Sequence, residues 1–408
     1  MKKWITEFVL YTVYMVFGAA WATTGAVMPQ IMADFQVDVS QAALMSNVIL
    51  WAKIVGSVCT AVLVARLGTR KSYLLGCVMI GLSVFIPVTH DFIVLLLLRF
   101  LGGLGGAICL VSLVPTVARF FDNRMAATLN SINCTSNIIG TIIALTLAVW
   151  LSTQLNGWRN LLAVYGAITL VLGVIWIVCF QDESAGEREA DGPVSRQAKW
   201  AALKAVVFSR IVWGMIAQYA GAMIMMVFMF TFLPLYYARY AHLPADSYAH
   251  FSGTVNQVGI MLGAFAGPVF KAKGFHYKTW LFSTSIVMAV TTFAMLFATR
   301  DSVILLCAFL TGLIFATWFA FIFSIPKEGL PVATTQTVTY AMSTFWFCTF
   351  IIATINSQLI GWSVDVTGGF TTGFAYVFAL MVISPVVALC VFPKGTPPGR
   401  GHSSSGRG

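Results

Sequence analysis

The heptapeptide Ala65-Arg66-Leu67-Gly68-Thr69-Arg70-Lys71 separates two long apolar runs, one from about 41 to 65 and one from 72 to about 89. Each run can cross a hydrocarbon core of about 30 Å at a rise of about 1.5 Å per residue. The three cations cannot lie in lipid, so the heptapeptide is expected on the cytoplasmic side, where basic loops concentrate. Gly68 lets the backbone reverse within a few residues. This stretch therefore predicts a tight turn between two membrane-spanning helices.

A second basic turn, at 271–278, follows a glycine-rich apolar run about half a chain length later. The repetition indicates two halves of similar plan. Apolar runs of spanning length lie near 8–29, 41–65, 72–89, 92–118, 125–151 and 158–180, and again near 208–236, 248–270, 279–298, 302–325, 333–361 and 371–392. The sequence therefore predicts an all-α polytopic membrane protein with twelve transmembrane helices in two bundles of six.

Composition supports a membrane protein. Of the 408 residues, 59% are hydrophobic and only 9% are charged, and the mean hydropathy is +0.87, so the polar residues are too few to cover a soluble globule. The net charge of +10 comes from cations in short turns and does not form one basic face, which argues against a nucleic-acid partner. All eight cysteines fall inside predicted helices, without the spacing of a disulfide framework or a zinc site. We expect no cofactor.

Four segments are expected along the chain. The first six-helix bundle takes residues 1–180, and a hydrophilic cytoplasmic linker takes 181–207. The second bundle takes 208–392. The tail, 393–408, is of low complexity and is expected to be disordered.

The distribution of cations sets the orientation. Three of the 24 lysines and arginines (Arg159, Arg239 and Arg300) fall in predicted external loops and two (Lys53 and Arg99) within helices, which leaves 19 for the cytoplasmic side. This bias predicts that both termini are cytoplasmic in the plasma membrane, the inner membrane of a bacterium.

The turn after the second predicted helix carries a recognisable pattern. Arg66, Gly68, Arg70 and Lys71 fit a basic motif in which an aspartate usually stands where this chain has Ala65. With the six-plus-six plan and the central linker, the chain resembles the major facilitator superfamily (MFS) of secondary transporters. The resemblance implies that these four cationic and glycine positions act in gating.

Two further patterns extend the resemblance over most of the chain. Arg99 is followed by Gly103 and Gly105, as in the fourth helix of the family, and Gly157-Trp158-Arg159 resembles a family turn. The resemblance implies a transporter that works by alternating access around a cavity near the membrane midplane, and not an enzyme. The overall character is most similar to the bacterial cyanate, nitrate and organic-anion permeases. A monomer is expected.

Lys53 is the strongest functional candidate. It lies near the middle of the second predicted helix, where a charged side chain costs at least about 2.5–3.5 kcal/mol. It shares a helical stripe with Ser46, Ser57 and Thr60, which favours a polar face on a cavity. The alternative is a structural lysine bonded to neighbouring carbonyl groups.

Other polar and aromatic residues within predicted helices accompany Lys53. Arg99 lies seven residues into its helix and serves either a second anion contact or packing. Asparagines at steps of three and four in the fifth helix either bind a ligand or join helices. The candidate substrate-binding residues are Lys53, Arg99, Asn130, Asn133, Asn137, Tyr14, Trp21, Gln218, Asn256, Gln336 and Tyr340.

The expected partners are a small-molecule or ion substrate and the lipid bilayer. Acidic residues lie in loops or near helix ends, whereas the mid-helix charges are cations, so a small anion is the expected substrate. The alternative is an importer of a metal or metal chelate, of the copper type, in which the thioethers of Met225 and Met229 hold a soft metal. A multidrug exporter is a further alternative.

The cation bias makes the orientation testable. Single cysteines at Ser184, in the linker, and at Ser247, in a predicted external loop, should react with a membrane-impermeant maleimide from opposite sides of the membrane. Labelling of both positions from the same side would contradict the twelve-helix topology.

Overall fold

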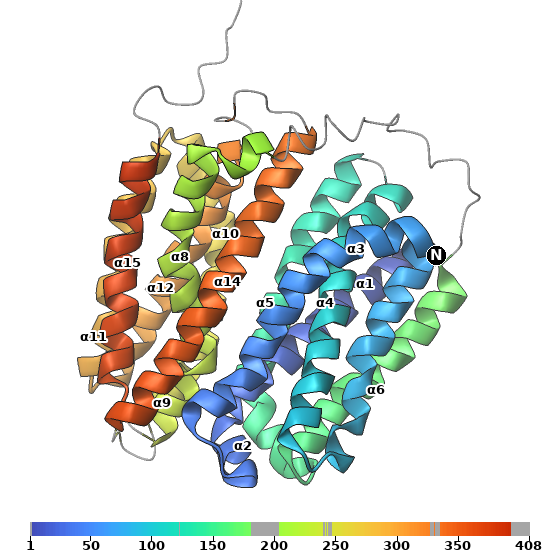
Figure 1. The fold of residues 1–408 in the computed structure, drawn as a ribbon, viewed down its shortest axis with the longest axis horizontal. Helices are drawn as coiled ribbons and strands as arrows, with labels where there is room; N and C mark the ends of the chain where they lie inside the picture. Colours follow the sequence, from blue (N-terminus) through green and yellow to red (C-terminus); the bar gives the residue numbers. More distant parts are fainter. Residues whose placement is uncertain are drawn as a thin grey trace, which may run out of the picture.

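The computed structural model describes residues 2–121, 123–180, 204–239, 241, 243, 247–326, 330 and 335–392. These residues form helices joined by short connections, with no strand among them (Figure 1). Most of the predicted linker, 181–203, and the whole tail, 393–408, lie outside the described residues, so the four segment boundaries stay predictions.

The helices divide into two bundles that follow each other in the chain (Figure 1). The first bundle contains α1 (Lys2–Ala26), α2 (Met28–Phe35), α3 (Val39–Gly81), the 3-10 helix η1 (Leu82–Val88), α4 (Phe92–Phe120), α5 (Asn123–Gln154) and α6 (Trp158–Cys179). The second contains α8 (Arg210–Thr231), α9 (Leu233–Arg239), η3 (Tyr248–Phe251), α10 (Ser252–Ala272), α11 (Tyr277–Phe297), α12 (Asp301–Ile322), α14 (Thr335–Thr367) and α15 (Thr371–Val391).

The prediction of twelve membrane-spanning helices is confirmed. Within the described residues, 11 segments are long and apolar enough to cross a membrane. The twelfth is α10, which is less apolar because it carries Asn256, Gln257 and several glycines. Two spans are joined in α3, where the backbone reverses at Gly68 with φ at 77°. This left-handed conformation is the reason a glycine is needed in the predicted turn.

Glycines allow close helix crossings within each bundle. A Cβ atom at Gly140 of α5 would lie 1.9 Å from the Met15 carbonyl oxygen of α1, and one at Gly263 of α10 would lie 2.0 Å from the Leu313 carbonyl oxygen of α12. Neither site has room for a larger residue. Such contacts are typical of membrane helices, because lipid provides no hydrophobic force to hold helices together and association depends on close packing.

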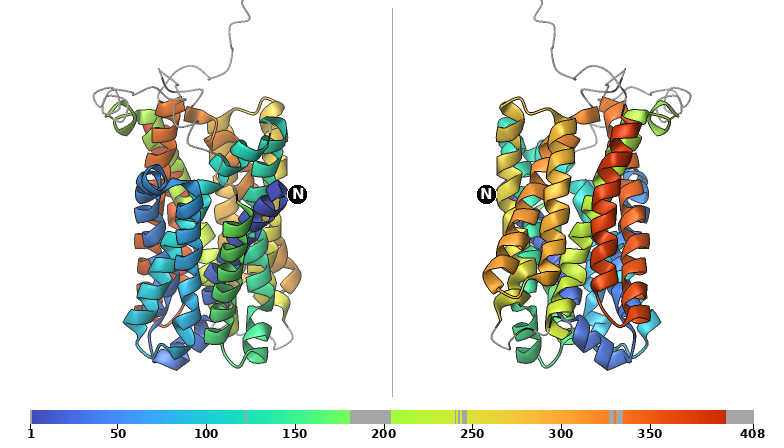
Figure 2. Two further views of the ribbon diagram at one scale, coloured as in Figure 1. Left: turned by 90° about the vertical axis from the view of Figure 1, so that its right-hand side faces the viewer. Right: turned by 90° about the vertical axis from the view of Figure 1, so that its left-hand side faces the viewer.

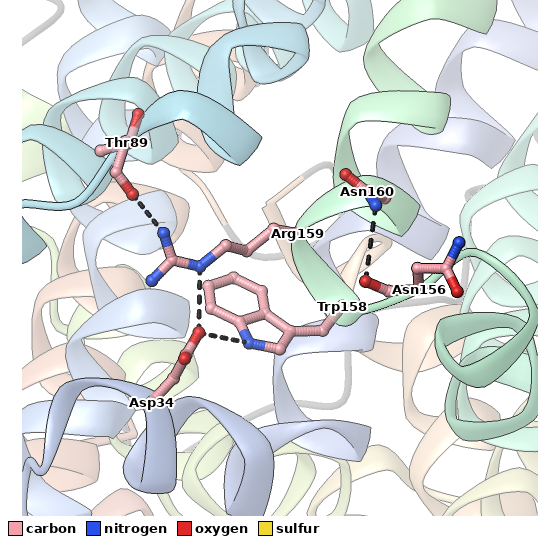
Figure 3. A network of polar contacts seen from close by, with 6 residues as sticks. All are labelled: Asp34, Thr89, Asn156, Trp158, Arg159 and Asn160. Atoms are coloured by element: carbon pink, nitrogen blue, oxygen red, sulfur yellow. Dashed lines mark hydrogen bonds and ion pairs between the residues drawn. The ribbon is translucent and has the colours of Figure 1, made fainter.

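The end of the molecule that carries α2 is tied together by one arginine (Figure 3). Arg159, at the start of α6, forms an ion pair with Asp34 of α2 at 3.0 Å and donates a hydrogen bond to the Thr89 carbonyl oxygen. The indole N–H of Trp158 also donates to Asp34, at 3.2 Å. The Gly157-Trp158-Arg159 turn therefore joins three connections of the first bundle at what we call the α2 end.

The two bundles meet mainly through α3 with α14 and through α5 with α10. Asn47 of α3 donates to Gln358 of α14 at 3.1 Å, and the Thr146 and Thr254 hydroxyls pair at 3.0 Å between α5 and α10. The hydrogen bonds between the bundles whose two partners are both described lie toward the α2 end. Figure 1 shows the ribbons of the two bundles diverging toward the opposite end, which carries the Gly68 turn, and Figure 2 shows the molecule from two sides.

Asp365 makes the most specific of these contacts. Its two carboxylate oxygens accept hydrogen bonds from the backbone N–H groups of Val39 and Ser40, both at 2.9 Å. These N–H groups belong to the first turn of α3 and have no carbonyl partner within the helix. A carboxylate from the second bundle thus caps a helix of the first bundle and also meets the positive end of its dipole.

Replacing Asp365 by Asn should loosen the α2 end. An amide has one acceptor oxygen and no charge, so one N–H of α3 loses its partner, at about 1–2 kcal/mol. Spin labels at Gln36→Cys and Gly369→Cys should then show a longer and broader distance distribution than in the parent protein.

Asp301→Asn serves as the matched control. Asp301 accepts from the Ser247 hydroxyl at 2.6 Å and from the Tyr248 N–H at 2.8 Å, but entirely within the second bundle. This variant should leave the label distance unchanged. An equal response to both substitutions would show that Asp365 has no particular role between the bundles.

Candidate functional site

Lys53 lies in the middle of the first span of α3, the part before Gly68, where the two bundles meet. Its side chain is only 6% exposed. The ammonium group lies 3.7 Å from the ring centroid of Trp21 and 5.4 Å from that of Phe17, both on α1, and 5.9 Å from that of Phe350 on α14. Ring faces attract a cation through their quadrupole, most strongly where water is excluded. The structure therefore surrounds the charge of Lys53 with rings from both bundles.

Lys53 has no carboxylate partner in the part of the chain that the structure describes. Nearby donors are also unsatisfied. The indole N–H of Trp21 and the side-chain amide N–H₂ of Asn137 are both buried and find no acceptor. Asn137 packs against Gly18 of α1, next to Phe17. Since an unpaired buried donor costs about 1–3 kcal/mol, this region is better suited to an acceptor than to a second cation.

Arg99 is used differently. It is 4% exposed, and its guanidinium donates to the Ala20 carbonyl oxygen of α1 at 3.0 Å and to the Met45 carbonyl oxygen of α3 at 3.4 Å. A longer contact, 3.5 Å, joins it to the Thr24 hydroxyl. Arg99 thereby fastens α4 to two neighbouring helices. It also lines one side of a small pocket that Trp21 borders.

Asn133 of α5 points to a carboxylate. Its side-chain amide donates to Glu7 of α1 at 2.8 Å, and both residues are buried. The second carboxylate oxygen of Glu7 has no hydrogen-bond partner. The asparagines of this helix were expected either to bind a ligand or to join helices. Asn133 joins α5 to α1, near the Gly68 end of α1.

Two predicted site residues of the second bundle form helix-to-helix hydrogen bonds. The amide of Gln218 donates to the Ser285 hydroxyl at 3.1 Å and to the Leu281 carbonyl oxygen at 3.2 Å, both on α11. The amide of Asn256 donates to the Ala308 carbonyl oxygen on α12 at 2.9 Å. Neither contact points to the first bundle, so these residues are not brought together with Lys53.

Two of the remaining candidates, Tyr14 and Tyr340, lie among the side chains that the structure describes, and two do not. Tyr14 is buried and stacks with Phe17, at 5.9 Å between ring centroids and 19° between planes. Tyr340 is half-buried on α14. The side chains of Asn130 and Gln336 lie outside the described part, so their roles stay predictions.

The methionines proposed as metal ligands lie in the core of the second bundle. Met225 is 1% exposed and Met229 is fully buried, both on α8. No group of three or more His, Cys, Asp or Glu residues that could hold a metal lies among the described residues. Thioethers in this position pack as ordinary apolar side chains.

The predicted gating turn is held against α6. Arg70 donates to the Ile177 carbonyl oxygen at 2.6 Å, and the Trp176 indole N–H donates back to the Arg70 carbonyl oxygen at 3.0 Å. Arg66 and Lys71 are exposed on either side of Gly68. Because these two hydrogen bonds join the turn to α6, we expect the turn and the end of α6 to move together.

Sequence reasoning missed Phe17 and Phe350 as neighbours of Lys53, and Asp365 as a cap for α3. A phenylalanine in an apolar helix gives no signal that sets it apart from packing residues. For Asp365 the indication in the sequence was only weak, because an acidic residue close to a helix end can cap the N-terminus of another helix or bind groups in its own loop.

Comparisons with known proteins agree on the family. The sequence model of the Major Facilitator Superfamily matches residues 10–354. An uncharacterised protein of Campylobacter jejuni, Cj0987c, is 34% identical over 313 residues, which cover 76% of this chain and 95% of that protein.

Solved transporters share the fold at low sequence identity. A bacterial homologue of the human lysosomal transporter Spinster, in an inward-facing and unoccupied conformation, has a TM-score of 0.76 at 13% identity, with 96% of each chain covered. The nucleoside transporter NupG has a TM-score of 0.76 at 14% identity, covering 96% of this chain and all of that one. A D-xylose–proton symporter has a TM-score of 0.72 at 14% identity, covering 96% of this chain and 98% of that one.

The bonds of Arg99 predict a structural role that can be separated from binding. In Arg99→Lys, the ammonium cannot donate to acceptors on α1 and α3 at once, as the planar guanidinium does. The melting temperature in detergent should fall by roughly 3–8 °C, while the affinity of the folded variant for small anions should stay within about threefold. A large loss of anion affinity at an unchanged melting temperature would place Arg99 in the binding site.

Proposed function

The chain belongs to the Major Facilitator Superfamily, and we propose that this secondary transporter moves a small anion across the membrane. The two bundles, meeting around Lys53, would rock against each other so that the site opens to one side at a time. We place the protein, as a monomer, in the plasma membrane of a bacterium with both termini in the cytoplasm.

The surroundings of Lys53 carry the proposal of an anion. The ammonium is buried between rings of α1 and α14, with no carboxylate partner among the described residues. The neighbouring indole N–H of Trp21 lacks an acceptor. Because both groups can donate and neither can accept, a bound carboxylate or inorganic anion would satisfy both, whereas a cation would add repulsion.

The arrangement of the bundles supports an inward-facing state. With the predicted orientation, the α2 end faces outside and the Gly68 turn faces the cytoplasm. The described hydrogen bonds between the bundles, those of Asp365 and Asn47 among them, all lie toward the α2 end. The contacts at the α2 end would thus close the path between Lys53 and the external side, while the site would be accessible from the cytoplasm.

The gating role of Arg66, Gly68, Arg70 and Lys71 is part of the same proposal. In the outward-facing state the bundles would meet at the cytoplasmic side, close to this turn. Its cations lie about half a membrane from Lys53, so they are expected to govern the rate of switching more than the affinity for the anion. Ala65 offers no carboxylate for an ion pair there.

The charge of Lys53 can be tested directly. Lys53→Met keeps much of the side-chain stem but removes the charge, so binding of small anions to purified protein should fall more than about a hundredfold, since breaking a poorly solvated pair costs about 3–5 kcal/mol. Lys53→Arg should recover part of the binding, because the charge remains but its reach changes. Calorimetry with a panel of anions and uptake by proteoliposomes provide the measurements.

Lys273→Met is the control, because Lys273 is an exposed cation near the turn after α10. It should bind and transport as the parent protein does. Wild-type anion affinity in folded Lys53→Met would remove Lys53 from the site and leave the anion proposal without its main support.

A further inference from the structure

We propose that the transported anion is a monocarboxylate with a flat apolar body, an aryl carboxylate, whose ring lies on the aromatic surface of α12 and α14 while its carboxylate pairs with Lys53. This inference rests on the proposed anion transport and names the chemical class that the same site would prefer.

A continuous series of rings leads away from Lys53 along the second bundle. Phe350, next to the ammonium, stacks on Trp346 with ring centroids 5.4 Å apart and planes at 23°. Trp346 contacts Phe323 at 6.1 Å, and Phe323 stacks on Phe319 at 5.4 Å with planes at 8°. We call Phe319, Phe323, Trp346 and Phe350 the aromatic wall. A planar ligand would lie against the outer faces of these two pairs, the faces that the partner ring does not cover.

The wall is backed by buried rings. Tyr219 of α8 contacts Phe319 at 6.5 Å and Trp346 at 5.9 Å, and it is itself only 1% exposed. Phe345, behind the wall on α14, is fully buried. The wall residues, in contrast, are half-buried or, like Phe323, 40% exposed. Buried backing fixes the orientation of the outer rings, so their faces are available without rearrangement of the core.

The shortage of free polar groups argues against an inorganic anion. Such an ion must exchange its hydration shell for several donors. Gln218 and Asn256 already donate to α11 and α12, and Arg99 donates to carbonyl oxygens of α1 and α3. What remains around Lys53 among the described residues is the Trp21 N–H, the Asn137 amide N–H₂ next to Phe17, and ring faces. An ammonium with an indole and an amide donor fits the two oxygens of one carboxylate, and ring faces fit an apolar body.

The position of Phe350 joins the two parts of the site. It is the one wall residue in contact with Lys53 among the described ring and cation pairs, and it comes from the opposite bundle. A ligand ring placed on Phe350 and Trp346 therefore has its carboxylate directed toward Lys53 and Trp21. It would contact both bundles at once, as a substrate carried by rocking bundles must.

Binding of benzoate, cyclohexanecarboxylate, acetate and nitrate to the purified full chain tests this inference by calorimetry. Benzoate should bind at least about tenfold more tightly than acetate or nitrate, and about threefold more tightly than the puckered cyclohexanecarboxylate, since stacking adds to area burial. Phe350→Leu should weaken benzoate binding about five- to tenfold but acetate binding only about twofold, because acetate loses the contact of Phe350 with Lys53 but has no ring to stack.

Phe347→Leu is the matched control, because Phe347 lies on the same helix, is 38% exposed and has no described ring contact with the wall. It should bind all four probes as the parent does. Equal affinities for benzoate and cyclohexanecarboxylate, or equal losses for benzoate and acetate in Phe350→Leu, would overturn the inference.

The two proposals fail differently. If acetate or nitrate binds in a manner that requires Lys53 while benzoate does not bind, the anion transporter stands and the aryl preference falls. If none of the four anions binds to wild-type protein that melts cooperatively, the anion site itself falls and the inference falls with it.

Discussion

The burial of one ammonium group, that of Lys53, constrains the middle of this molecule more than any other feature. A charge at this depth must find water, a counter-charge or a polarisable surface, because hydrocarbon offers none of them. The rings of Phe17, Trp21 and Phe350 supply part of that compensation. Since Phe350 belongs to the second bundle, the stability of the charge depends on how the bundles are placed. If the anion pairs with Lys53 as proposed, binding and movement are linked at one atom.

The sequence was sufficient for the helices and insufficient for their contacts. Apolar runs and basic turns predicted twelve spans and the reversal at Gly68, because lipid permits few alternatives for the backbone. The directions of polar side chains could not be predicted. Gln218 and Asn256 both lie on helices with protein on several sides, so helical period alone cannot tell a cavity from a neighbouring helix. Lys53 was identifiable because a charged side chain in the middle of an apolar membrane helix has a high free-energy cost and therefore requires a specific reason.

The two ends of the bundle interface are built unequally. At the α2 end, Asp365 caps α3 across the interface, and the amides of Asn47 and Gln358 pair beside it. At the Gly68 end, the family position of the aspartate is Ala65, and the exposed cations of the turn remain. Among the described residues, charge and hydrogen bonding thus favour contact at the α2 end, and they stabilise the state in which that end is closed.

The cap on α3 also bears on how the protein is made. Val39 and Asp365 are separated by 326 positions, so the first turn of α3 enters the bilayer long before its partner has been synthesised. Until α14 is inserted, water or Asp38 must serve these N–H groups. The first bundle can then form early, but the first turn of α3 receives its carboxylate partner only after α14 has been synthesised. The first bundle therefore reaches its final structure only after α14 of the second bundle has been inserted.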